Sequence, residues 1–173
     1  MKLLDKAIAL AWEQAMATTH GRTLLASGEE VEITAMLQDA LSQLLGNETL
    51  PGFSPAIFGA PIRGQELDDY ITDGVMRFQN GNYAWAMPHA GMIGYVAAGH
   101  HTGAKDALAK KWFQVKPAPC APLFAMVEDR SMSPVVVIST HSRSFVLRNG
   151  EAPGNIMLRH IWLSEPSSTS TVS

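Results

Sequence analysis

The sequence predicts an α+β domain in which about five helices are followed by a small sheet of about three short strands. Two observations predict this class. Apolar residues recur at three- and four-residue spacing through most of the chain up to about residue 113, which is typical of helices with one buried face. Beyond Pro117 they gather instead in short runs rich in β-branched residues, which are typical of strands. Helices first and strands last is the order expected of an α+β protein.

Length and composition limit the domain organisation. The chain has 173 residues, enough for one domain with a core of its own and short for two. We expect a single domain over residues 1–163 and a flexible, Ser/Thr-rich tail over residues 164–173. Hydrophobic residues make up 46% and charged residues 17%, which excludes a mostly disordered chain. The net charge of −3 excludes nucleic-acid binding by bulk positive charge alone.

Two helices are predicted in the first part of the chain. The first runs from Lys2 to about Thr18, where apolar residues form one stripe. The second begins at Ser27, because Ser27 and Glu30 have the spacing of a capping box, and Gly46 is placed to end it.

Three more helices are predicted after a Pro- and Gly-rich loop over residues 47–65. The third covers about Glu66 to Gln79, and a short fifth covers Lys105 to Phe113. The fourth is predicted from Pro88 to Ala98, since proline is favoured in a first helical turn. This fourth helix is apolar on most sides, which predicts a central place with three buried side chains: Met92, Ile93 and Val96.

Three short strands complete the predicted fold. The first two are the apolar runs Leu123 to Val127 and Val135 to Ile138. The third, Asn155 to Leu163, carries large residues on both alternating faces, so we expect both of its faces to be covered.

The clearest polar candidate site follows the second predicted strand. His141 and Arg143 are two residues apart, so in an extended chain they point to the same side, and His160 lies in the next strand. An imidazole beside a guanidinium can bind an anion such as phosphate or carboxylate. We therefore expect His141, Arg143 and His160 to form an anion-binding or partner-binding patch. The alternative is structural: His141 bonds a backbone carbonyl and Arg143 pairs with a surface acid.

Acidic residues at two helix starts are alternative metal ligands. Glu30 and Glu32 open the second predicted helix, and Asp68 and Asp69 open the third. Carboxylates hold Mg²⁺ in enzymes that cleave phosphodiesters, but acids at a helix start also stabilise the helix dipole. The sequence lacks a GxSxG nucleophile motif, a P-loop and a GxGxxG loop.

Other features bear on the cellular compartment. No run of eighteen apolar residues occurs, so we expect no membrane span. The single cysteine, Cys120, excludes a disulfide framework and a multi-thiolate zinc site. The first residues do not resemble a signal peptide, which favours a cytoplasmic protein.

Several segments resemble a known superfamily. These segments are residues 29–34, 70–78, 81–84, 91–96, 139–143 and 156–163. Together they resemble parts of uncharacterised bacterial proteins related to the restriction-endonuclease-like, PD-(D/E)XK nuclease superfamily, over about half of the chain. The resemblance implies a reduced restriction-endonuclease-like core and a link to phage defence or mobile elements.

The chain departs from that superfamily at the catalytic motif. The resemblance implies an acid on one strand and Glu-x-Lys on the next, just before Tyr70. The corresponding segment, Phe53 to Pro61, contains neither an acid nor a lysine, and no lysine in the chain has an acid two positions before it. Without these groups the carboxylates that hold the metal and the lysine that stabilises the charged phosphate are missing.

These observations predict a non-catalytic, nuclease-like subunit of a bacterial phage-defence or mobile-element complex, without a cofactor. Its expected partners are a larger protein complex and, as a second candidate, DNA. Two alternatives stay open. One is an active nuclease that holds Mg²⁺ with the migrated acids Glu30, Glu32, Asp68 or Asp69. The other is a regulatory or adaptor protein without a nucleic-acid role.

Overall fold

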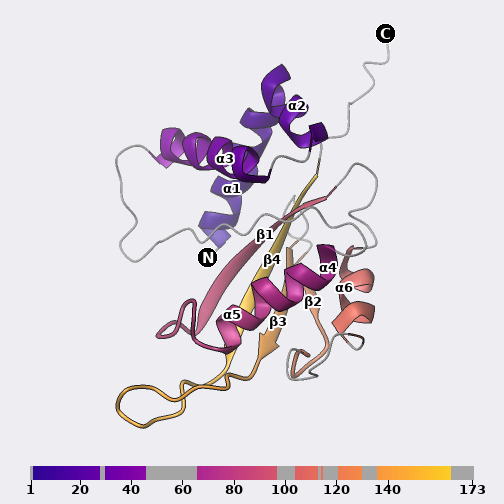
Figure 1. Cartoon of the computed structure of the whole chain (residues 1–173). Coiled ribbons are helices and arrows are strands. Elements are labelled where there is room, and N and C mark those ends of the chain that lie inside the picture. Colours follow the sequence, from indigo (N-terminus) through magenta and orange to yellow (C-terminus); the bar gives the residue numbers. More distant parts are fainter. Residues whose placement is uncertain are drawn as a thin grey trace.

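The computed structural model describes residues 2–27, 30–45, 66–96, 104–112, 114, 121–129 and 136–164 (Figure 1). It confirms the α+β class. The four strands are β1 (His89–Val96), β2 (Val127–Asp129), β3 (Val136–His141) and β4 (Ile156–Ser164). They form one mixed sheet in the order β1-β4-β3-β2.

β4 lies inside the sheet between β1 and β3. It runs parallel to β1 and antiparallel to β3, and β2 pairs antiparallel with β3. The register places Met92 of β1 and Val137 of β3 on either side of His160 of β4. Because side chains alternate between the faces of a sheet, these three residues share one face. Arg159 and Ile161, their neighbours along β4, face the opposite side.

Helices cover the two faces of this sheet. The first layer contains α1 (Lys2–Ala17), α2 (Thr19–Ser27) and α3 (Glu30–Leu45), and its core includes Trp12 and Ile161. The second layer contains a continuous helix over residues 66–79 and α6 (Ala104–Trp112). In Figure 1 the first layer lies at one end of the sheet, and the helix over residues 66–79 crosses in front of the strands.

The helix over residues 66–79 changes its winding in the middle. It consists of α4 (Glu66–Asp69), the π-helical segment η1 (Tyr70–Val75) and α5 (Met76–Gln79). Its buried residues recur every four positions: Leu67 and Ile71, then Val75 and Gln79, and in parallel Tyr70, Gly74 and Phe78. In an α-helix each four-residue step would rotate the buried face by about 40°. The wider π-helical turn keeps this face directed at the sheet.

The predicted helix from Pro88 to Ala98 is wrong, because this segment forms strand β1. Met92 and Ile93 are buried as expected, whereas the side chain of Val96 is outside what the structure describes. Met92 packs in the core below the helix over residues 66–79, and Ile93 packs against the N-terminal helices. A strand covered on both faces is apolar all round, which is also the pattern of a buried helix.

Other boundaries also needed correction. The first helix is confirmed, but a further helix, α2, follows it directly and ends at Ser27. The hydroxyl of Ser27 donates to the carbonyl of Leu24, so it does not open the next helix, which begins at Glu30. Gly46 and the loop over residues 47–65 lie outside the described residues. β1 precedes α6, so the helices do not all come before the strands.

The strands after residue 117 lie close to their predicted positions. β3 and β4 match the second and third predicted strands within three residues at each end. β2 begins at Val127, where the first was expected to end, although the backbone N–H of Leu123 also donates to Thr140 O over 2.7 Å. No helix in the described part of the chain combines the length and the apolarity that a membrane span requires.

The corner between α1 and α2 gives a prediction about Gly21. A methyl group at this position would lie 2.2 Å from the carbonyl oxygen of Ala15, too close for the two helices to keep their contact. We expect Gly21→Ala to lower the free energy of unfolding by about 1–3 kcal/mol despite the better helix propensity of alanine. Urea unfolding followed by circular dichroism measures this change.

Gly91 provides the matched control. A methyl group on Gly91 of β1 would meet only a carbonyl oxygen at 4.0 Å, an ordinary contact. Gly91→Ala should therefore leave stability unchanged or raise it by about 0.4–1 kcal/mol. Equal losses in the two variants would show that the approach to Ala15 is not what requires glycine at position 21.

Candidate functional site

A chain of four hydrogen-bonded polar side chains lies inside the second layer. Tyr70 Oη is 2.7 Å from His160 Nδ1, and Ser139 Oγ is 2.7 Å from His160 Nε2. Ser139 Oγ is also 2.7 Å from His141 Nε2. All four residues are buried, and both imidazoles are fully buried. The structure thus brings His141 and His160 together through a serine, and adds a tyrosine that the sequence did not indicate.

The strand register explains how these groups meet. Ser139 and His141 are two residues apart on β3, so both point to the same face as His160 of β4. Tyr70 approaches from the first residue of η1. The Trp112 ring covers the pair from α6, with its centroid 5.5 Å from that of His141 and 5.8 Å from that of His160.

Burial controls the protonation of this chain. Burial, and to a smaller extent the nearby His141, lowers the pKa of His160 to about 3. Burial also raises the pKa of Tyr70 above its usual value, and the indole of Trp162 opposes this shift. At neutral pH His160 is therefore uncharged and Tyr70 keeps its proton.

We assign one of the two directions of hydrogen bonding that these protonation states allow. Tyr70 donates to His160 Nδ1, His160 Nε2–H donates to Ser139, and the Ser139 hydroxyl donates to His141. The two inner groups, His160 and Ser139, then each accept one hydrogen bond and donate one. The hydrogen bonds thus form a continuous chain across one face of the sheet. Each bond in such a chain polarises the next, so the strength of one bond depends on the others.

Arg143 does not join the two histidines. β3 ends at His141, and the Arg143 guanidinium donates to two backbone carbonyls of another segment, Trp85 O at 2.8 Å and Met87 O. Its centre also lies 5.8 Å from the centroid of the Phe145 ring. The imidazole and guanidinium that the sequence placed in one anion site therefore belong to two different places in this structure.

The segment that Arg143 holds is a tight turn before β1. The N–H of Met87 donates to Ala84 O over 2.9 Å, and Ala84 has a φ of +47°, which is unfavourable for a residue with a side chain. Beside this turn, Ser144 N–H donates to Gln79 O over 3.0 Å. The side chain of Trp85 is nevertheless 58% exposed and that of Met87 is 47% exposed. We call residues 84–87, with the clamping Arg143, the clamped turn.

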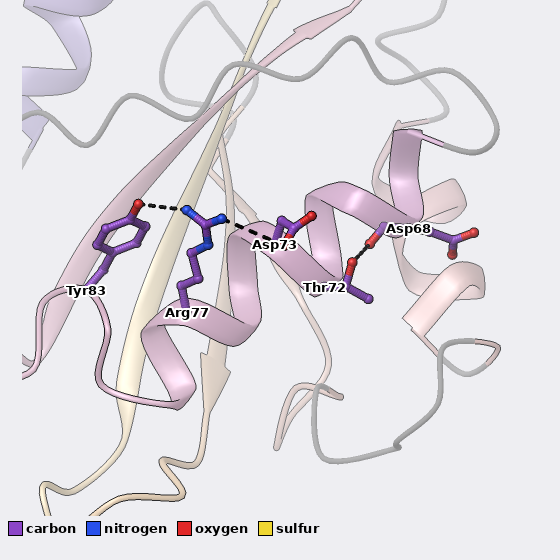
Figure 2. A network of polar contacts seen from close by, with 5 residues as sticks. All are labelled: Asp68, Thr72, Asp73, Arg77 and Tyr83. Atoms are coloured by element: carbon purple, nitrogen blue, oxygen red, sulfur yellow. Dashed lines mark hydrogen bonds and ion pairs between the residues drawn. The ribbon is translucent and has the colours of Figure 1, made fainter.

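Asp73 forms a surface ion pair with Arg77, and Figure 2 shows this pair with the hydrogen bonds of Tyr83 and Thr72 on the same helix and turn. Arg77 lies between Asp73, at 3.8 Å, and the Tyr83 hydroxyl, to which it donates over 2.9 Å. Thr72 donates to the backbone carbonyl of Asp68, and the Asp68 carboxylate lies 2.9 Å from Lys111 Nζ of α6. These two carboxylates stabilise the helix over residues 66–79 and its contact with α6.

The four alternative metal ligands come from two separate layers. Glu30 and Glu32 belong to α3, whereas Asp68 and Asp69 belong to α4 on the other side of the sheet. Within the described ranges, no three or more His, Cys, Asp or Glu residues are grouped as ligands of one metal ion.

One buried charged cluster was missed in the sequence. Arg159 of β4 pairs with Asp5 of α1, and its Nη2 also lies 3.5 Å from Asp129 Oδ2 of β2. The side chains of Arg159 and Asp5 are 8% and 2% exposed. In the sequence, Arg159 and Asp5 each lie within an apolar run, which is an unusual position for a charged residue. This position was the signal that could have identified the buried cluster. This charge cluster ties the N-terminal helices to the sheet.

Comparisons with known proteins identify no relative: no family model, no curated protein and no solved structure matches this chain.

Proposed function

We propose that this protein is a non-catalytic binding subunit that docks on a protein partner through the clamped turn. The observation that carries the proposal is an exposed tryptophan on a turn whose backbone is fixed. Arg143 bonds two carbonyls of the turn, and the turn contains a residue with positive φ.

Three physical arguments support a binding role for this turn. Tryptophan, with arginine and tyrosine, contributes most of the energy at many protein interfaces, usually from a pocket of the partner. A turn that is already fixed loses little conformational entropy on binding, which increases affinity. Strained backbone that the surrounding structure maintains is also concentrated at functional sites. A partner with an apolar pocket wide enough for an indole fits Trp85 and Met87.

We further propose a more specific class for this binding subunit: a nuclease-like subunit of a bacterial phage-defence or mobile-element complex. The sequence resemblance alone supports this class. DNA is a second candidate ligand, supported by the excess of basic residues over acidic ones, nine to six, between residues 71 and 173. In this proposal Arg143 acts by holding the turn, and the histidines act inside the fold.

Photo-crosslinking followed by affinity measurement tests the proposal. A photoreactive amino acid at position 85, in cells that express the full chain, should crosslink to one defined protein. With that protein purified, we expect Trp85→Ala to weaken binding at least tenfold, about 1.4 kcal/mol or more, without a change in melting temperature. Arg143→Ala and Arg143→Lys should both weaken binding, because lysine keeps the charge but does not bridge two carbonyls in a planar fork.

Val31 of α3, which is 82% exposed, is the matched control. A photoreactive residue there should not capture the same protein, and Val31→Ala should bind normally. Full affinity in Arg143→Lys together with loss in Arg143→Ala would mean that Arg143 acts as a positive charge. Unchanged affinity in Trp85→Ala would contradict docking through this turn.

A further inference from the structure

α6 covers the paired histidines through a small set of contacts. One side of this nine-residue helix presents Lys105, Leu108 and Trp112 to the rest of the protein. Leu108 and Trp112 are buried in the core, and Trp112 lies on both imidazoles.

Ion pairs hold α6 at both ends. Lys105 Nζ lies 3.7 Å from Glu128 of β2, and Lys111 Nζ lies 2.9 Å from Asp68 of α4. Both pairs are partly exposed, and they join α6 to the strand β2 and to the helix α4. Besides apolar packing, the described contacts of α6 include these two ion pairs and the contact of the Trp112 ring with both imidazoles.

The charged and titratable groups around the histidine pair can be named element by element. η1 contributes Tyr70, α4 contributes Asp68, and β2 contributes Glu128, which lies opposite Val137 in the same row as His160. α6 itself contributes two lysines, Lys105 and Lys111. A proton added to His160 would place a positive charge on a fully buried ring that water does not reach while α6 covers it.

We propose that α6 is an acid-released cover: protonation of His160 separates it from the sheet and exposes Ser139 between the two imidazoles. The hydrogen-bond chain favours the closed state at neutral pH, because His160 is neutral there and both rings are bonded. When α6 separates, water reaches His160 and its ring can carry a charge.

Proton linkage gives the direction and size of the effect. In the closed state burial keeps the pKa of His160 near 3, whereas an imidazole in water titrates near 6.5. The open state therefore binds more protons between these two pH values, and falling pH favours opening. From pH 7 to pH 5 the titration of His160 should raise the opening equilibrium about 25-fold.

Hydrogen exchange of the full chain, read by mass spectrometry at pH 7 and pH 5, tests this proposal. After correction for intrinsic exchange rates, amides of residues 104–112 should be less protected than those of residues 2–17 and 30–45 at both pH values. Their protection should fall at least about 25-fold at the lower pH. Equal protection in the three segments would mean that α6 opens only when the whole domain unfolds. Protection of residues 104–112 that does not change with pH would equally overturn the proposal.

Two variants separate the histidines from the ion pairs. His141→Gln with His160→Gln keeps polar groups at both positions but removes their titration, so the pH dependence should disappear. Glu128→Gln removes the carboxylate that pairs with Lys105 and leaves both histidines in place, so it should lower protection by the same factor at both pH values. A double glutamine variant that folds and keeps the pH dependence would contradict the proposal, and the wild-type measurement is decisive even if that variant does not fold.

Discussion

Replacing Asp5 with alanine is expected to lower the free energy of unfolding by about 3–5 kcal/mol, because it leaves Arg159 charged and buried next to a cavity. Asp5 accepts a hydrogen bond from the Arg159 guanidinium, and Arg159 Nε has no hydrogen-bond partner in the described part of the chain. The remaining carboxylate, Asp129, lies at 3.5 Å and cannot fully replace Asp5. Chemical unfolding of the variant at pH 7 measures the loss.

The matched control removes both charges together. Asp5→Leu combined with Arg159→Met fills the same region with apolar groups, and such exchanges are often neutral or stabilising by about 1–4 kcal/mol. We expect the double variant to be more stable than Asp5→Ala by several kcal/mol. A double variant as unstable as the single one would show that packing at these positions, and not the unpaired charge, dominates.

The second large effect is expected for Trp162→Ala. Trp162 is buried on β4, and its partner in register on β1 is Gly94, which offers no side chain to fill the space. Loss of a buried indole leaves a cavity and costs about 3–5 kcal/mol. Trp85→Ala is the same substitution at an exposed position and should change stability by no more than about 0.5 kcal/mol.

Gly94 allows an internal check of this cavity. Gly94→Leu alone should overpack the site and cost about 1–3 kcal/mol. When Gly94→Leu is combined with Trp162→Ala, the added leucine side chain enters the space that the indole has left. The double variant should therefore lose less free energy of unfolding than the sum of the losses in the two single variants. Additive losses would mean that residue 94 does not face the Trp162 ring.

Helices and paired strands were predictable where the apolar pattern has one clear period. The stripe from Ile8 to Ala15 predicted α1, and alternating large residues predicted β4 within one residue at each end. β1 was not predictable on the same basis. Its neighbouring residues Met92 and Ile93 are both buried, so the period of two disappears.

The candidate site was predictable only in part. The sequence placed His141 just after one predicted strand and His160 in the next, whereas the structure places both on strands and joins them through Ser139. Tyr70 and Trp112 were missed because an aromatic residue on a helix stripe is usually a core residue, and only the tertiary fold directs both of them at the histidines. Arg143 was assigned to the same site because residues two apart in an extended chain share one side, but β3 ends at His141, so that alternation does not extend to Arg143.

The order of strands along the chain has a consequence for protein synthesis. Of the four described strands, β4 is the last to be synthesised, yet it lies between β1 and β3, and it begins 60 residues after β1 ends. At translation rates of about 5–20 residues per second, β1 waits roughly 3–12 s for this neighbour. Throughout that delay the nascent chain presents an apolar strand without its sheet neighbour, so the period just before β4 emerges is when misassembly is most expected and when a chaperone would have most effect.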